Sequence, residues 1–386
     1  MDNNSERMTK RNPFLSGLFS LFVPGLGHIY VGLTKKAMFY HIGAWICLFL
    51  SWTLVFCNTF ISLIITHVFI VIYWIVVFVD AIVSTAKRKM ISFQKGKTVL
   101  FYIFAIVIFI VVSRLISYPA KKYLAMNQSY KVATSAMSPL IELGDYVIVQ
   151  KTKSVERNDI ISFELNDTVR YMYRCVALSG DTLQLKNGLV YINNNLTEND
   201  AELKFGYFFQ SDSNISFLDG FEYEKLDGNN EGLYVIFMTN QEKKQLQESV
   251  SLDFFSFINN KPDDRIFAYS PFVEWNSDYY GPIIIPQKGE TIKMSFDNVL
   301  FYASLIQLYE GEKNVRVNEA NILEINRKMV STYTFKHDYY YLMGDNRHNA
   351  VDSRFWGAVP DYKIKGKVQY ILASQDINKI GKNINQ

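Results

Sequence analysis

The first third of the chain is crowded with apolar residues, and this crowding limits the fold more than any other feature of the sequence. Three apolar runs, at about residues 37–56, 59–79 and 98–118, reach the length of about 20 residues that a helix needs to cross a bilayer. An earlier run, residues 13–31, is broken by Pro24-Gly25-Leu26-Gly27, and we interpret it as a re-entrant or interfacial segment. The sequence therefore predicts a membrane anchor over residues 1–120.

Basic residues around these runs predict the orientation of the anchor. They precede and follow the broken run at residues 13–31 and separate the second and third spans, whereas the connection at Cys57-Asn58-Thr59 carries no charge. The residues concerned are Arg7, Lys10, Arg11, Lys35, Lys36, Lys87, Arg88, Lys89, Lys95 and Lys97. Because basic segments stay on the cytoplasmic side, we expect a cytoplasmic N-terminus and a C-terminal body on the outer face of the membrane.

The charge balance and the residue types exclude several classes of function. A net charge of +3 over 386 residues is too small for a nucleic-acid binder that depends on phosphate contacts. The five histidines and three cysteines show no metal-ligand spacing, and the sequence has no Gly-rich phosphate loop. We therefore expect no metal, no cofactor and no nucleic-acid partner.

The chain after about residue 127 changes to short alternating runs separated by turn formers. Runs typical of strands cover residues 146–149, 160–163 and 189–193, and turns are marked by Gly144-Asp145, Gly180-Asp181 and Asn187-Gly188. Strands at this spacing predict a mostly β domain.

Residues 343–360 form the most specific motif of the chain, because few surface loops need so many turn formers and charges in so few positions. They read MGDNRHNAVDSRFWGAVP and follow the aromatic run at 339–342. Two earlier stretches are TSAMSPLIELGD at 134–145 and YMYRCVALSGD at 171–181. In their order along the chain, the three stretches resemble the signature boxes of the type I signal peptidases. These are the membrane-bound serine proteases that cut signal peptides from exported proteins.

The resemblance implies a fold and a location. It implies N-terminal transmembrane helices followed by a mostly β signal-peptidase-like domain with an inserted β-containing region. We place the core at residues 121–196 and 331–375 and the inserted region at 197–330. The expected location is a bacterial-type cytoplasmic (inner) membrane, crossed more than once, with the C-terminal domain on the periplasmic or extracellular face.

In the first box, Met137, Pro139 and Gly144-Asp145 fix the register against the family pattern. The position of the family's nucleophilic serine is then Ala136, and a methyl group cannot attack a carbonyl. Thr134 falls where the family places a hydroxyl that helps to form the oxyanion hole. We assign Thr134, Ser135 and Met137 to the oxyanion and substrate-binding part of the site.

In the second box, Arg174 and Gly180-Asp181 hold the register and place Tyr173 where the family has its general base, a lysine. A tyrosine has an ordinary pKa of about 10, and burial raises this pKa further. It is therefore a poor base. On a strand, the neighbouring Arg174 should point to the opposite face.

The last box keeps the residues that scaffold the site in the family, although Ala350 replaces a serine that is usual in the middle of the box. The scaffold residues are Gly344, Asp345, Asn346, Arg347, Asp352 and Arg354. Three altered functional positions beside an intact scaffold indicate that the catalytic chemistry is lost.

Three functional hypotheses follow. The first is a catalytically impaired or inactive signal-peptidase relative that binds signal peptides or exported preproteins by strand addition; its partners include the lipid bilayer, and an active signal peptidase is a candidate partner. The second is an active signal peptidase with a displaced nucleophile, Ser135 or Ser138, and with His348 or Tyr173 as the base. The third is a non-proteolytic membrane scaffold whose function is carried by the inserted region.

Overall fold

The computed structural model describes residues 10–56, 60–88, 107, 110–111, 114, 127–152, 154–166, 169–197, 202–211, 215–226, 232–250, 252–269 and 273–384. The chain divides into two compact units, Met1–Met126 and Asn127–Gln386, and each is described by itself. The third predicted span, residues 98–118, lies outside the described residues except for four helical positions.

The interrupted apolar run near the N-terminus folds as two short helices. Helix α1 (Pro13–Phe22) begins after Asn12, whose side chain accepts hydrogen bonds from two backbone N–H groups of the first turn. Such a cap satisfies donors that the helix itself cannot pair. Helix α2 (Leu26–Tyr30) follows the Pro24-Gly25 turn, and the Ser16 hydroxyl donates to the Gly27 carbonyl at 2.9 Å, which ties the two helices together.

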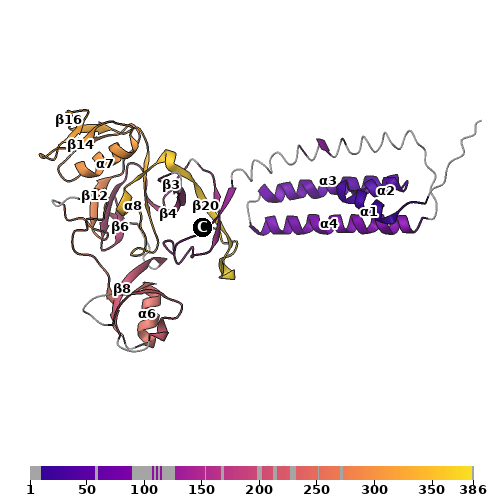
Figure 1. Cartoon of the computed structure of the whole chain (residues 1–386), viewed down its shortest axis with the longest axis horizontal. Coiled ribbons are helices and arrows are strands. Elements are labelled where there is room, and N and C mark those ends of the chain that lie inside the picture. The colour runs from indigo at the N-terminus through magenta and orange to yellow at the C-terminus, as the bar shows by residue number, and fades with distance from the viewer. Residues whose placement is uncertain are drawn as a thin grey trace, which may run out of the picture. The chain divides into compact units, whose positions relative to one another are not determined.

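Two long helices, α3 (Thr34–Phe56) and α4 (Phe60–Ala86), pack against each other, and α1 lies along α4 (Figure 1). Many of their outward apolar side chains are about half exposed, among them Ile46, Val68, Phe69, Ile72 and Ile75. Within the part of the chain that the structure describes, one helical stretch, His67–Ala86, is long and apolar enough to cross a membrane. It overlaps the second predicted span and ends later than Val79, and the arrangement with several spans stays a prediction.

The C-terminal unit is mostly β, as predicted. Its largest sheet has seven antiparallel strands in the order β1-β2-β20-β3-β4-β18-β19. These strands are β1 (Asn127–Lys131), β2 (Tyr146–Gln150), β3 (Ile160–Glu164), β4 (Arg170–Ala177), β18 (Tyr339–Met343), β19 (Val359–Pro360) and β20 (Ile364–Ala373). The strands predicted at 146–149 and 160–163 are confirmed. Val147 and Val149 of β2 alternate into the core, and β3 is buried on both faces.

A second sheet has the order β12-β5-β6-β7, with β5 (Thr182–Lys186), β6 (Leu189–Ile192), β7 (Asn195–Leu196) and β12 (Tyr280–Ile284). Asn187 and Gly188 join β5 to β6, and their φ angles of 53° and 75° are both left-handed. A two-residue hairpin turn needs this conformation, which Asn and Gly adopt most easily. The predicted turn is therefore confirmed.

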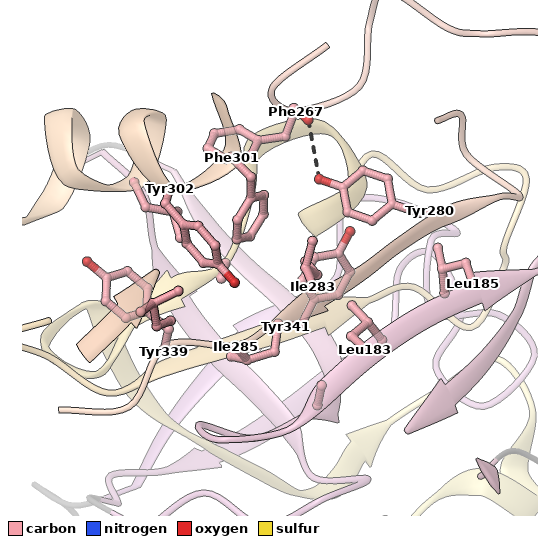
Figure 2. Close-up of a cluster of buried hydrophobic side chains, with 14 of the residues drawn as sticks. Leu183, Leu185, Phe267, Tyr280, Ile283, Ile285, Phe301, Tyr302, Tyr339 and Tyr341 are labelled. Atoms are coloured by element: carbon pink, nitrogen blue, oxygen red, sulfur yellow. Dashed lines mark hydrogen bonds between the residues drawn. The ribbon is translucent and has the colours of Figure 1, made fainter. Parts of the chain in front are cut away.

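An aromatic core fixes strand β18, which leads into the last signature box. Tyr339 and Tyr341 of β18 point into a cluster with Tyr280, Phe301 and Leu183 (Figure 2). The Tyr280 hydroxyl donates to the Phe267 carbonyl at 3.2 Å, shown dashed in Figure 2. Leu342, which follows Tyr341 in sequence, packs into the core on the opposite face. Both faces of β18 are thus held, and this fixes where the following loop starts.

A third sheet, in the order β11-β8-β10-β9, packs one face on helix α6 (Asn240–Ser249), and Figure 1 shows it apart from β3, β4 and β20. Its strands are β8 (Lys204–Gln210), β9 (Glu222–Lys225), β10 (Leu233–Thr239) and β11 (Phe255–Ser256). The remaining elements are η2 (Ser216–Leu218), β13 (Thr291–Lys293), α7 (Val299–Tyr309), β14 (Val315–Val317), β15 (Leu323–Ile325), β16 (Lys328–Val330), β17 (Thr332–Thr334), α8 (Ser353–Trp356), η3 (Asp361–Lys363) and η4 (Ile377–Lys379). The predicted limits of the core and of the inserted region stay predictions.

Candidate functional site

The three signature boxes meet at Gly344, directly after β18. A Cβ placed on Gly344 would lie 2.4 Å from the Ala350 Cβ, 2.6 Å from the Ala136 carbonyl oxygen and 3.3 Å from Cε1 of Tyr173. These distances leave no room for a side chain at residue 344. Ala136, Tyr173 and Ala350, which are far apart in the sequence, are therefore packed around one backbone position.

Ala136 lies in the loop between β1 and β2, and the last box holds its backbone. The Asn346 N–H donates to the Ala136 carbonyl at 3.0 Å. The Ala136 methyl group is buried, as is the side chain of Met137 beside it. Ala136, which we predict to stand at the nucleophile position of the resembling family, is thus part of an apolar cluster.

Tyr173 lies on β4 and packs among aromatic rings. Its ring centroid is 5.6 Å from that of Trp356, 6.1 Å from that of Phe163 and 6.4 Å from that of Tyr171. Burial, followed by the nearby negative charge of Asp352, raises the pKa of the Tyr173 hydroxyl well above its ordinary value. The phenol is therefore neutral at physiological pH and cannot take a proton from a serine.

Arg174 points away from Tyr173, as predicted for neighbours on a strand. Its guanidinium forms a two-pronged ion pair with Asp345, with Nε–Oδ1 and Nη2–Oδ2 distances of 2.7 and 2.6 Å. The pair joins the second box to the last box. It also directs the cation away from the Tyr173 hydroxyl.

Asp352 and Arg354 form the buried centre of the last box. One Asp352 oxygen accepts from the Arg354 backbone N–H and Nε, and the other accepts from the Gly344 N–H at 3.0 Å. Arg354 Nη2 donates to the Arg347 carbonyl at 2.6 Å. Because both charges are removed from water and bonded to each other, each depends on its partner. The pair fixes the turn around Gly344.

Arg347 and His348 connect the last box to other strands. Arg347 donates to the Gly344 carbonyl at 3.0 Å and to the Gly188 carbonyl, in the β5–β6 turn, at 3.2 Å. His348 Nδ1 accepts from the Gly206 N–H at 2.8 Å, and its Nε2 lies 2.8 Å from an Asp278 oxygen. Both ring nitrogens are occupied. The proposal of His348 as a base for Ser135 or Ser138 therefore finds no support in this geometry.

The serines that flank Ala136 point to two different carboxylates. The buried Ser138 hydroxyl bonds to Glu142, four residues further along the same loop. The Ser135 hydroxyl donates to Oε1 of Glu222 on β9 at 2.6 Å. Thr134 lies exposed beside them, where its hydroxyl is accessible to a ligand.

Glu222 is the site residue that the sequence did not identify. Its carboxylate accepts from Ser135 and from the side-chain amides of Asn349 at 2.7 Å and Asn346 at 3.3 Å. It lies 87 residues from Ser135 in the chain, and no local pattern separates it from neighbouring acidic residues such as Glu224. Three donors on one carboxylate fasten β9 to the first and last boxes.

The sequence of this chain is similar to that of a known protein family. A family model described as signal peptidase, peptidase S26, matches residues 96–229 and 284–373, which is more than half of the chain and includes all three boxes. Signal peptidase I of Buchnera aphidicola subsp. Acyrthosiphon pisum is 23% identical over 65% of this chain and 70% of that protein. Signal peptidase I of Aquifex aeolicus is 22% identical over 66% of this chain and 78% of that protein. Signal peptidase I of Haemophilus influenzae is 54% identical, but over only 9% of this chain and 10% of that protein.

Proposed function

The chain belongs to the signal peptidase family, peptidase S26, and from that premise we propose that it binds the signal peptides of exported preproteins without cutting them. One observation carries the proposal: Ala136, Tyr173 and Ala350 pack around Gly344 where the family places its reacting groups. A methyl group, a neutral phenol and a second methyl group supply neither a nucleophile nor a base.

The expected fall in turnover is large enough to make the protein inactive rather than a slow enzyme. Loss of the serine nucleophile in a serine protease lowers turnover on the order of a million-fold. Donors that remain near Ala136, such as the Thr134 hydroxyl, leave at most a small rate above that of water. Turnover on a biological time scale is therefore not expected.

Peptide binding needs backbone groups that are free to pair, and the largest sheet supports this part of the proposal. Strand β1 stands at one end of the strand order, and among the described strands it pairs with β2 alone. An edge strand can accept an extended peptide as a further strand, through main-chain hydrogen bonds that need no nucleophile. Because β1 leads into the first box, a peptide added there would run towards Ala136.

The proposed location is a bacterial-type cytoplasmic membrane, with the C-terminal domain on the outer face. The helical stretch His67–Ala86 and the half-exposed apolar side chains of α3 and α4 support contact with lipid. Single cysteines at residues 89 and 374, in a chain without its native cysteines, test the orientation with a membrane-impermeant thiol reagent. We expect the reagent to label residue 374 alone from outside. Labelling of residue 89 alone would show that the protein has the opposite orientation.

The function is tested with the full chain in liposomes and a preprotein that carries a signal peptide. The natural chain should bind the preprotein and leave it uncut. The double variant Ala136→Ser with Tyr173→Lys, and a triple variant that adds Ala350→Ser, run beside it as attempts to restore the family's groups. If a variant cleaves the preprotein and the natural chain does not, the natural chain has a binding groove but lacks the reacting groups. Cleavage by the natural chain would contradict the proposal.

The hydrogen bond between Ser135 and Glu222 favours a second candidate function, an active peptidase with a displaced nucleophile. The Ser135 hydroxyl already donates to a carboxylate at 2.6 Å, the arrangement in which a base removes a serine proton. If the protein is such a peptidase, the natural chain cleaves the preprotein, and cleavage disappears in both Ser135→Ala and Glu222→Gln. Cleavage that survives both changes would exclude it.

A further inference from the structure

The third sheet has two buried faces, and only one of them packs on helix α6. Ile236 and Met238 of β10 lie in the core beneath α6. Val235 and Phe237 alternate with them and therefore point to the opposite face. In the register of the sheet, Val235 is opposite Glu224 and Phe237 is opposite Glu222. The second face thus carries apolar residues of β10 beside the acidic residues of β9.

A cavity of about 540 Å³ lies between this second face and the last signature box. We call it the sheet–box cavity. Its apolar lining comprises Leu226, Val235, Phe237, Phe257, Ala350, Val351 and Phe355. Its polar lining includes Ser277, Arg347, His348, Asn349 and Arg354. Glu224 and Arg265 also line it, and both side chains are largely exposed, which places them at its opening. Its volume lies within the range of about 300–1,000 Å³ that is typical of ligand pockets.

The cavity is continuous with the candidate site. Asn349 and Ala350 line it, and these are the residues that hold Glu222 and contact Gly344. Glu222, Glu224 and Leu226 alternate along one side of the β9 segment, so they lead from Ser135 into the cavity. Four residues of extended chain span about 13 Å, a distance that a short peptide segment can cover.

We propose that the sheet–box cavity receives a large apolar side chain from the bound exported chain, a few residues away from the part that lies at Ala136. This inference rests on the proposed function and adds a specificity-determining subsite to it. The apolar walls match a side chain such as Phe or Leu, while Glu224 and Arg265 at the opening face the polar peptide backbone. Val235, Phe237, Phe257 and Arg265 lie between residues 230 and 283, which the family model does not match. The preference therefore belongs to this chain rather than to the family pattern.

The test uses the full chain in liposomes and a series of labelled signal-peptide segments in which each position in turn is Phe or Ser. At one position, Ser is expected to weaken binding by about 10- to 100-fold, the effect of failing to bury one large apolar side chain. Val351 is 61% exposed at the cavity, so Val351→Trp should obstruct the cavity with little effect on folding. The Phe-over-Ser preference should disappear in this variant. Leu308→Trp, at a similarly exposed residue of α7, is the matched control and should keep the preference.

Crosslinking to the natural chain gives a second measurement, which does not depend on any substitution in the protein. A peptide with a photoreactive benzophenone side chain at the preferred position should label segments 232–237 or 255–257. A preference that persists in Val351→Trp, or a crosslink confined to other segments, would overturn the cavity proposal and leave peptide binding intact. Failure of the natural chain to bind any peptide of the series would overturn both this inference and the proposed function.

Discussion

The backbone N–H of Asn346 donates to the carbonyl oxygen of Ala136 at 3.0 Å, so the last signature box holds the backbone of the first one. The same turn carries the buried Asp352–Arg354 pair and the contacts around Gly344. These contacts join the first and last signature boxes at one tightly packed turn.

Gly344→Ala should destabilise the protein, because the new methyl group would lie 2.4 Å from the Ala350 methyl and 2.6 Å from the Ala136 carbonyl oxygen. Overpacking of this kind typically costs about 1–3 kcal/mol. Chemical denaturation followed by tryptophan fluorescence measures the free energy of unfolding. Adding Ala350→Gly should recover part of the loss, since it removes one of the two close contacts. An unchanged stability in Gly344→Ala would show that the three boxes are less tightly packed than described.

Asp352→Ala should be strongly destabilising, because it leaves the buried guanidinium of Arg354 without its counter-charge. Removing one partner of a buried ion pair typically costs about 3–5 kcal/mol. Glu312→Ala is the matched control: Glu312 and its partner Lys336 have side chains that are 25% and 50% exposed, and such a pair contributes about 1 kcal/mol or less. Equal losses of unfolding free energy in the two variants would contradict the central role of the Asp352–Arg354 pair.

Tyr173 should make the folded state less stable at alkaline pH. Burial and the charge of Asp352 raise its pKa in the folded state, so above about pH 10 the unfolded chain loses this proton first. The stability that it contributes is complete below pH 10 and falls by about 1.4 kcal/mol per pH unit above it. Tyr173→Phe should reduce this slope in denaturation measured from pH 9 to 11. Phe163→Leu, a change in the neighbouring ring, should lower stability without altering the slope.

Glu222→Ala should loosen β9 from the signature boxes, because the donors of Ser135, Asn346 and Asn349 lose their common acceptor. Each buried donor left unpaired costs about 1–3 kcal/mol. Hydrogen exchange should become faster in residues 222–225 and 346–349. Glu222→Gln retains an acceptor oxygen and should have a smaller effect, and Glu224→Ala, on the same strand, should have almost none. Equal exchange in Glu222→Ala and Glu224→Ala would show that Glu222 does not fasten the strand.

The mostly β body and its turns could be predicted because their signals are local. Alternation of apolar residues gave β2 and β3, and Asn187-Gly188 gave a hairpin, since the left-handed backbone that such a turn needs is a property of those two residues. The order of the boxes predicts a register in which Ala136 and Tyr173 take the positions of the nucleophile and the base, and this register stays a prediction. The structure adds that both lie against Gly344, which no spacing in the sequence reveals.

The partners of His348 and Ser135 could not be predicted, because they come from segments without a motif. His348 looked like a free base in the sequence, yet Gly206 and Asp278 occupy its two nitrogens. Glu222 reached the site only because β9 pairs with β10 in a register that turns its carboxylate towards Ser135. One residue of slip in that pairing would send the carboxylate to the other face of the sheet.

The sequence by itself determined the family and the mostly β body, because each is written in residue types at fixed spacing. It also predicts that Ala136 and Tyr173 replace the reacting hydroxyl and amine. Tertiary structure alone decided that the altered residues pack into one apolar cluster, that Glu222 joins the site and that a cavity opens beside Ala350. The physical reason is that backbone preferences and motifs act over a few neighbouring residues. Contacts between segments more than 80 residues apart depend instead on how sheets and cores pack together, which is set by the whole chain.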